Sequence, residues 1–530
     1  MRTILQAKRG EKGSITVYLL LCTVFVLLPM AGLAIDINIM YNVKSKLQTA
    51  VDAAAIGAGV TLQRTTDLTV PSQVTAVQAS ASKFFHANFP SGYFKTSEVY
   101  YGSTPYKDGT GAMTIYVHAA EHVPLLFMHV LGLSQATVTA QSTAKIRYVA
   151  LMIAVDRSGS VWRAGNDNVI EQTLKTYIYY APTDTVPLGD PAGQSVFVDG
   201  RDTIGLVSFG GTYSLDYAPS INYKTGTNKL VTAISNMDAE FDTHNSTNTG
   251  EGLYQAYYQL KNTINQPGAL NVIILLTDGQ PTSFSGAFVP SLPGCLTGNG
   301  SNPITGFINT PVSSSPFTFS NTGTVSGVYK TQYPSGCASP GPGSLGCEAT
   351  VVPLNPGPAN KCNYSANADN VSSDISTFPP SAGPVLTPDG GLGNQTFNTL
   401  ASGYYVGVGA TNTTSSPKNI RVASYNVADN IATTIRKDTA LNPIIYVIGL
   451  NEPGTEEPLN ADWLARVAND PNYRATGVDK SGLAPKKYNA GDAVLQTVPT
   501  QTQGAYYNVT SATLGQAFQQ IAAQILRLSQ

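Results

Sequence analysis

The longest apolar stretch of the chain lies close to its amino terminus. Residues 15–35 carry no charged side chain, and this length matches the roughly 20 residues that an α-helix needs to cross a bilayer. Basic residues dominate the segment before this stretch, and Asp36 follows it. Because positive charge is retained on the cytoplasmic side of a membrane, the pattern predicts a single-pass protein. Its amino terminus would be cytoplasmic and residues 37–530 would lie outside.

A cleaved signal peptide is the alternative to a retained anchor, because residues 32–34 (Gly-Leu-Ala) offer a tolerable cleavage site. However, the apolar stretch is longer than the roughly 7–15 residues of a usual signal core. This length favours a retained anchor whose helix continues through residues 37–63.

Short apolar runs alternate with helical periodicity from residue 147 onward. Strand-like runs are found at 152–155, 202–209, 272–276, 443–450 and 504–509, and helical spacing is found at 253–260, 422–435, 463–467 and 514–525. Strands that alternate with helices are typical of a mainly parallel sheet covered by helices on both faces. The predicted fold class is therefore α/β, of the Rossmann-like kind.

The remaining segments predict a stem and an insert. Residues 64–146 combine a helical stretch with alternating segments at 113–118 and 136–144, which is typical of a small α+β unit. No charged side chain occurs from residue 281 through 329, and such Pro-, Gly- and Ser-rich sequence builds loops and irregular β-structure. The expected parts are an anchor segment (1–63), the stem (64–146), the first part of the α/β domain (147–281), a loop- and β-rich insert (282–419) and the second part of the α/β domain (420–530).

Hydroxyl and carboxylate side chains follow two of the predicted strands. The first strand ends in Asp156, with Ser158 and Ser160 in the turn behind it, and the third strand runs into Asp278. Thr247 precedes the predicted helix at 253–260, which lies in sequence between these two strands. Because parallel strands present ligands at their carboxyl ends, we expect these side chains to converge. Hard oxygen donors with few charges suit Mg²⁺. Taken singly, each piece also reads as a helix cap or a turn.

The set Asp156, Ser158, Ser160, Thr247 and Asp278 resembles the metal-ion-dependent adhesion site of the von Willebrand factor A (vWA) domain. The resemblance implies that Mg²⁺, or Mn²⁺ in its place, is held by these residues, in part through water. It also implies an open coordination position for an acidic residue of a protein partner. The expected function is therefore metal-dependent binding rather than catalysis.

The amino-terminal segment carries a second resemblance. Residues 9–17 (Arg-Gly-Glu-Lys-Gly-Ser-Ile-Thr-Val) open the anchor, residues 31–36 close it, and residues 47–55 (Leu-Gln-Thr-Ala-Val-Asp-Ala-Ala-Ala) follow. This string resembles TadG-like proteins of the Flp (tight-adherence) pilus assembly system. The resemblance implies a bacterial inner-membrane protein whose bulk is periplasmic, with pilus or envelope components as partners.

Composition agrees with an extracytoplasmic location and gives no sign of nucleic-acid binding. Charged residues make up 12% of the chain and the net charge is −2, whereas ordinary soluble domains carry about 25% charged residues. A nucleic-acid-binding domain would show a basic patch.

Two alternatives to a binding function remain open, namely a metal-dependent hydrolase and an envelope scaffold with a vestigial metal site. Hydrolysis would need a general base beside the metal, and both carboxylates of the predicted site are committed to coordination. A separate motif at 118–122 (His-Ala-Ala-Glu-His) fits the pattern of inverted zincins. That chemistry needs a helix, and the alternation before His118 and the nearby Pro124 disfavour one.

Four of the five cysteines lie in the predicted insert, at Cys295, Cys337, Cys347 and Cys362. An even number of cysteines in an exported, loop-rich segment is typical of disulfides. A zinc site is the alternative, although no Cys-x-x-Cys pair is present. We predict that mass mapping of the natively isolated, unreduced protein finds all four paired. Four free thiols would contradict this expectation.

Overall fold

The computed structural model describes residues 12–109, 111–179, 197–211, 213–237, 246–278, 281–290, 304–309, 375–377, 417–451, 459–473 and 498–529. The four cysteines of the predicted insert and most of that insert lie outside these residues. The protein folds into two compact units, residues 1–147 and 148–529, each with most of its contacts within itself.

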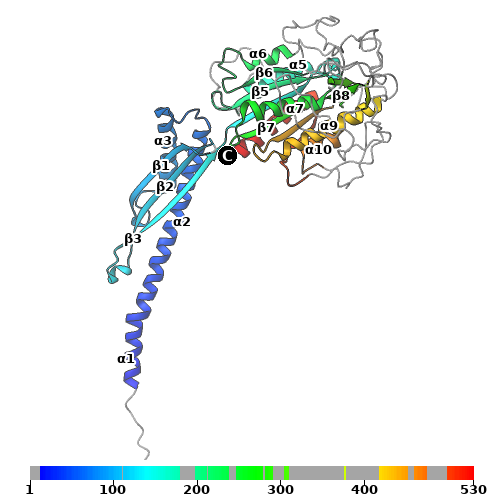
Figure 1. Cartoon of the computed structure of the whole chain (residues 1–530). Helices are drawn as coiled ribbons and strands as arrows, with labels where there is room; N and C mark the ends of the chain where they lie inside the picture. Colours follow the sequence, from blue (N-terminus) through cyan, green and yellow to red (C-terminus); the bar gives the residue numbers. More distant parts are fainter. Residues whose placement is uncertain are drawn as a thin grey trace, which may run out of the picture. The chain divides into compact units, whose positions relative to one another are not determined.

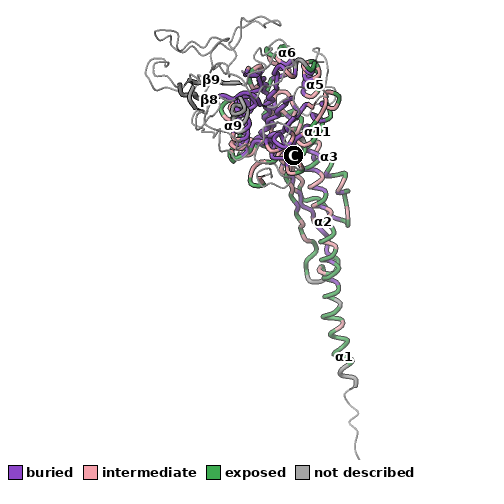
Figure 2. The backbone as a smooth tube through the Cα atoms, turned by 90° about the vertical axis from the view of Figure 1, so that its right-hand side faces the viewer, coloured by how far each residue is buried: buried purple, intermediate pink, exposed green. Residues whose placement is uncertain are grey.

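The first unit begins with a long helix (Figure 1). It consists of α1 (Lys12–Cys22), a π-helical turn (Thr23–Leu27) and α2 (Leu28–Gln63). The π turn ends two residues before Pro29, which lacks the N–H that a regular α-helical bond would need at this point. The stretch Thr16–Gln63 is the one helix in the described part of the chain that is long and apolar enough to cross a membrane. Its first half is exposed (Figure 2).

The second half of α2 packs on a small antiparallel sheet with strand order β1-β2-β3. Buried residues recur along α2 at helical spacing, including Val43, Leu47, Val51 and Ala54. The other elements of this unit are α3 (Pro71–Asn88), a short 3₁₀ helix (Tyr93–Lys95), β1 (Ser97–Lys107), β2 (Met113–Pro124), a second 3₁₀ helix (Met128–Leu131) and β3 (Gln135–Ile146). The helix and the two strands expected in the stem are present as α3, β2 and β3. Strand β1 was not predicted.

The second unit contains a six-stranded sheet in the order β12-β11-β7-β4-β5-β6. All neighbouring strands run parallel except β6, which pairs antiparallel with β5 at one edge. Its strands are β4 (Val149–Asp156), β5 (Thr203–Phe209), β6 (Tyr213–Ser220), β7 (Leu270–Thr277), β11 (Ile444–Leu450) and β12 (Ala505–Val509). The predicted α/β class with a mainly parallel sheet is confirmed.

Helices cover both faces of this sheet (Figure 1). One face packs against α7 (Thr249–Tyr258), α9 (Pro417–Lys437) and α10 (Ala461–Ala468). The other packs against α5 (Asp167–Tyr179), α6 (Leu230–Asn236) and α11 (Leu514–Ser529). Successive side chains of β4 alternate between the two cores: Met152 belongs to the first, whereas Leu151 and Ile153 belong to the second. A strand buried on both faces is apolar throughout, which explains the unbroken hydrophobic run.

The remaining described elements are short. They are α4 (Gly159–Arg163), a π-helical turn after α7 (Gln259–Ile264), a 3₁₀ turn before α11 (Ser511–Thr513) and a separate pairing of β8 (Ser283–Pro290) with β9 (Ile304–Asn309) and β10 (Ile375–Thr377).

Gly504, directly before strand β12, allows the backbone to pass close to the neighbouring strand β11. A Cβ atom at this position would lie 1.9 Å from the carbonyl oxygen of Ile445 in β11. We therefore expect Gly504→Ala to reduce the free energy of unfolding by roughly 2 kcal/mol or more, because the backbone must shift to relieve the overlap. Denaturant unfolding of the full chain in detergent measures the change.

Gly515→Ala in α11 is the matched control, since a Cβ there meets nothing within 4 Å. Its greater helix propensity should raise stability by about 0.5–1 kcal/mol. Equal effects of the two substitutions would contradict the packing argument.

Candidate metal centre at the carboxyl edge of the sheet

Asp156 ends β4 in the interior of the sheet, and both oxygens of its buried carboxylate accept hydrogen bonds. Oδ1 accepts the backbone N–H of Ser158 at 2.9 Å, a bond of the kind that makes Asp a preferred turn residue. Oδ2 accepts the hydroxyl of Thr277 at 2.6 Å. Since Thr277 ends the neighbouring strand β7, the orientation of the carboxylate is fixed from two elements.

Serine hydroxyls connect this turn to the second acid. The Oγ atoms of Ser158 and Ser160 lie 3.0 Å apart, and the Ser160 hydroxyl donates to Oδ1 of Asp278 at 2.9 Å. Asp278 directly follows β7 and is buried. The structure thus brings Asp156, Ser158, Ser160 and Asp278 into one hydrogen-bonded chain, although 118 positions separate Ser160 from Asp278.

Thr247, the fifth predicted ligand, is buried in the segment that leads into α7. Its N–H donates to Oγ1 of Thr282 at 2.9 Å, and its carbonyl oxygen accepts the N–H of Thr282 at 3.0 Å. The next residue, Asn248, donates its N–H to the carbonyl oxygen of Gly210, just beyond β5. Thr247 is therefore held at the same edge of the sheet by its backbone, and its hydroxyl takes no part in these contacts.

Two supporting residues have no role in the sequence-based prediction. Thr277 orients Asp156, and its partner lies 121 positions away, so no local pattern indicates the contact. Asn248 caps α7 by accepting the N–H of Glu251 at 3.2 Å and donates to Oγ of Ser285 at 2.9 Å. An Asn three residues before a Glu is a recognisable helix start, so this signal was present in the sequence.

Glu251, in the first turn of α7 and four residues after Thr247, is a buried acid. Burial raises its pKa to about 7, whereas hydrogen bonds from Gln255 and Ser285 act in the opposite direction. The Gln255 side chain donates to Oε1 at 2.7 Å.

The donors at this edge are suited to a hard cation. They are carboxylate and hydroxyl oxygens, the ligand type that Mg²⁺ prefers. The described part of the chain holds no cluster of three or more His, Cys, Asp or Glu side chains that could hold a metal, so a centre here would depend on hydroxyls as well as acids.

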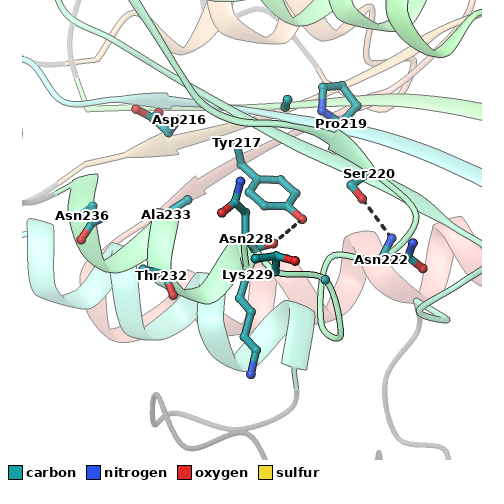
Figure 3. Close-up of a pocket in the computed structure, with 13 residues that line it drawn as sticks. Asp216, Tyr217, Pro219, Ser220, Asn222, Asn228, Lys229, Thr232, Ala233 and Asn236 are labelled. Atoms are coloured by element: carbon teal, nitrogen blue, oxygen red, sulfur yellow. Dashed lines mark hydrogen bonds between the residues drawn. The ribbon is translucent and has the colours of Figure 1, made fainter. Parts of the chain in front are cut away.

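A cavity of about 710 Å³ beside β6 and α6 lies apart from this edge (Figure 3). Its lining includes Ser220, which pairs with Ile204 at the amino end of β5, whereas Asp156 pairs with Phe209 at the carboxyl end. Asp216 and Lys229 are the charged residues among its described lining. The cavity therefore contributes nothing to the candidate centre.

The His-x-x-Glu-His motif lies on strand β2 rather than on a helix. Alternation along a strand directs His118 and His122 to one face and Glu121 to the other. These three side chains therefore do not converge on one point.

Comparisons with known proteins identify two segments of the chain. The profile of TadE/G-like Flp pilus-assembly proteins matches residues 13–61, and the profile of the von Willebrand factor type A domain matches residues 151–291. Both predicted resemblances are confirmed. No curated protein matches the chain.

Several solved structures are similar to the chain at low identity. A point mutant of the PilB minor pilin from Streptococcus sanguinis is 15% identical, with 82% of this chain and 78% of that chain covered and a TM-score of 0.33. The vWF domain of the type V pili tip protein Mfa5 from Porphyromonas gingivalis is 13% identical, with 73% and 98% covered and a TM-score of 0.26. BatB from Bacteroides thetaiotaomicron is 10% identical, with 72% and 98% covered and a TM-score of 0.26.

The buried Glu251 predicts a specific pH dependence of stability. Its pKa is about 7 in the folded chain and close to its usual value of 4.5 when unfolded. The folded state therefore binds this proton more tightly, so the contribution of Glu251 to stability is greatest below about pH 4.5 and is lost as the pH rises through about 7. One pKa unit corresponds to about 1.4 kcal/mol, so the loss of stability is at most roughly 3–4 kcal/mol.

Glu251→Gln should remove this loss, so that the variant melts above the wild type at pH 8 but not at pH 4.5. Thermal unfolding of both proteins across this range, with EDTA present, measures the effect. A variant that is less stable than the wild type at pH 8 would refute the assignment.

Proposed function

We propose that this chain, which joins a TadE/G-like segment to a vWA domain, is a membrane-anchored protein that binds a protein partner through a divalent cation. The cation is Mg²⁺, or Mn²⁺ in its place, and its ligands are Asp156, Ser158, Ser160, Thr247 and Asp278. The partner is a pilus or cell-envelope component that offers an acidic side chain. The single observation that carries this proposal is the hydrogen-bonded chain from Asp156 to Asp278 at the carboxyl edge of the sheet.

Burial of the two acids supports a cation at this position. The side chains of Asp156 and Asp278 are 0% and 2% exposed. Removing ionised carboxylates from water is costly unless a charge or a set of hydrogen bonds compensates them. Two acids joined through the Ser158 N–H and the hydroxyls of Ser158 and Ser160 concentrate negative charge, and a divalent cation would neutralise it with the oxygen ligands already assembled.

The chain's own residues set the orientation of this ligand set. The Ser158 N–H and the Thr277 hydroxyl each hold one oxygen of the Asp156 carboxylate, and such hydrogen-bonding partners typically tune the affinity of a metal site. A bound cation would supply a positive charge that attracts a partner's carboxylate.

Binding accounts for this arrangement better than hydrolysis. A hydrolase needs a free general base within reach of the substrate. Both oxygens of Asp156 accept hydrogen bonds, and Oδ1 of Asp278 accepts one from Ser160. No observation at the site favours a catalytic base, so hydrolysis is not proposed.

The long apolar helix and the TadE/G-like match support a membrane location. We propose that residues 15–35 span the bacterial inner membrane once, with the amino terminus in the cytoplasm and residues 37–530 in the periplasm. Protease added to spheroplasts should then digest most of the chain while a cytoplasmic marker survives. Complete protection of the vWA domain would contradict this topology.

The metal proposal predicts that Mg²⁺ stabilises the folded chain, because a ligand that binds only the folded state shifts unfolding by mass action. Titrating EDTA-treated protein with millimolar Mg²⁺ should raise the melting temperature and give a binding isotherm in calorimetry. Asp156→Ala should fold but lose both responses, since the apolar strand behind it is unchanged. Thr277→Val should keep the response with a Kd weakened by about 10–100-fold.

Asp199→Ala is the control for the loss of a carboxylate, because Asp199 accepts hydrogen bonds from Lys224 and Thr225 away from the centre. This variant should respond to Mg²⁺ as the wild type does. If Mg²⁺ neither binds to the wild type nor shifts its melting temperature, the domain is a scaffold with a vestigial site.

A further inference from the structure

The connection between β2 and β3 is unusually apolar for an exposed loop. Residues 125–134 (Leu-Leu-Phe-Met-His-Val-Leu-Gly-Leu-Ser), here called the β2–β3 loop, contain no Asp, Glu, Lys or Arg. The side chains of Leu126, Phe127 and Leu133 are 60%, 45% and 52% exposed. Single exposed apolar residues are ordinary, but a contiguous set of large ones marks an interaction surface.

Asp36 fixes this loop to the anchor helix. Its buried carboxylate accepts three backbone N–H groups of the loop: Oδ1 accepts that of Leu126 at 2.9 Å, and Oδ2 accepts those of Phe127 at 3.0 Å and Met128 at 2.7 Å. Asp36 is the first charged residue after the apolar stretch 15–35. The loop therefore lies beside the point where that stretch ends.

The contact of Phe127 with Gly32 shows that the loop extends past Asp36, alongside the apolar stretch of the helix. A Cβ atom at Gly32 would lie 2.5 Å from Cβ of Phe127, so the Phe127 side chain occupies the space that the missing side chain leaves. Gly32 lies inside the apolar stretch, one helical turn and about 6 Å before Asp36 at 1.5 Å per residue. Figure 1 shows this end of the β1-β2-β3 sheet pointing toward α1.

We propose that the β2–β3 loop inserts into the outer leaflet of the membrane that the anchor helix crosses, with Leu126, Phe127 and Leu133 in contact with lipid. Asp36 acts as a positioning residue that holds the loop at this depth. The stem is then attached to the membrane at two points, the helix and the loop, and this second contact limits tilting of the stem on its anchor. The inference rests on the proposed membrane span.

A lipid partner fits this surface better than a protein does. The apolar loop side chains continue the exposed apolar surface of the helix, where Leu33 and Ile35 are also exposed. Apolar groups at this depth are expected to lie at the boundary between headgroups and acyl chains. The absence of Lys and Arg from the loop predicts insertion that does not depend on anionic lipid.

Photocrosslinking of the full-length chain in liposomes tests the proposal. Benzoylphenylalanine would replace Leu126 in the loop, Phe25 in the span, or Tyr106, which is exposed at the opposite end of the sheet, where it pairs with Thr114. After irradiation in phosphatidylcholine vesicles with and without phosphatidylglycerol, mass spectrometry reads lipid adducts. We expect comparable adduct yields at positions 25 and 126 in both lipid mixtures, and only background at 106.

The outcomes separate this inference from the proposed anchor. Lipid adducts at 25 but not at 126, or adducts at 126 to a second copy of the chain in place of lipid, would overturn the loop insertion and leave the anchor intact. No adducts at 25 would overturn the anchor and the inference with it. Asp36→Ala should reduce the yield at 126 while leaving the yield at 25 unchanged, and an unchanged yield at 126 would refute the positioning role of Asp36.

Discussion

The hydrogen bond between Thr277 and Asp156 is the contact on which the candidate centre depends. It joins the carboxyl ends of two neighbouring parallel strands, and the turn behind Asp156 then brings Ser158 and Ser160 toward Asp278. A parallel sheet makes this possible because it collects strand ends from distant parts of the sequence at one edge. The same geometry buries two acids, and this burial is the physical reason for the proposed cation.

The position of a strand in its sheet, central or at the edge, also explains which strands could be predicted from the sequence. Strands β4 and β7 are buried on both faces, so their apolar runs are continuous; β4 ends at Asp156, and Asp278 directly follows β7. Strands β1 and β6 are absent from the sequence-based prediction. Both are edge strands and both contain a proline, Pro105 and Pro219 respectively. Proline is tolerated at edges because one side of such a strand is unpaired, and it obscures the alternation that would otherwise indicate a strand.

The candidate ligands were predictable from residue type and order, whereas the contacts that hold them were not. Asp156, Ser158 and Ser160 form a recognisable turn, and the positions of Thr247 and Asp278 follow from the vWA resemblance. The role of Thr277 depends on a partner that only the folded sheet brings near. The pKa of Glu251 depends on how completely the folded chain buries it, and hydrophobic periodicity does not reveal that degree of burial.

The two units perform different physical tasks in this account. The first places a long apolar helix and an apolar loop at a membrane, and the second presents oxygen ligands at one edge of a rigid sheet. Coupling these tasks is how the proposed protein would hold a partner at the cell envelope, and the proposal rests on its TadE/G-like and vWA segments.

Anomalous X-ray scattering from crystals grown with Mn²⁺ is the most direct test of the central claim. The account predicts one strong anomalous peak within coordination distance of the Ser158, Ser160 and Thr247 hydroxyls, with Asp156 and Asp278 bound directly or through water. Fully occupied Mn²⁺ elsewhere in the chain, with no peak at this edge of the sheet, would contradict it.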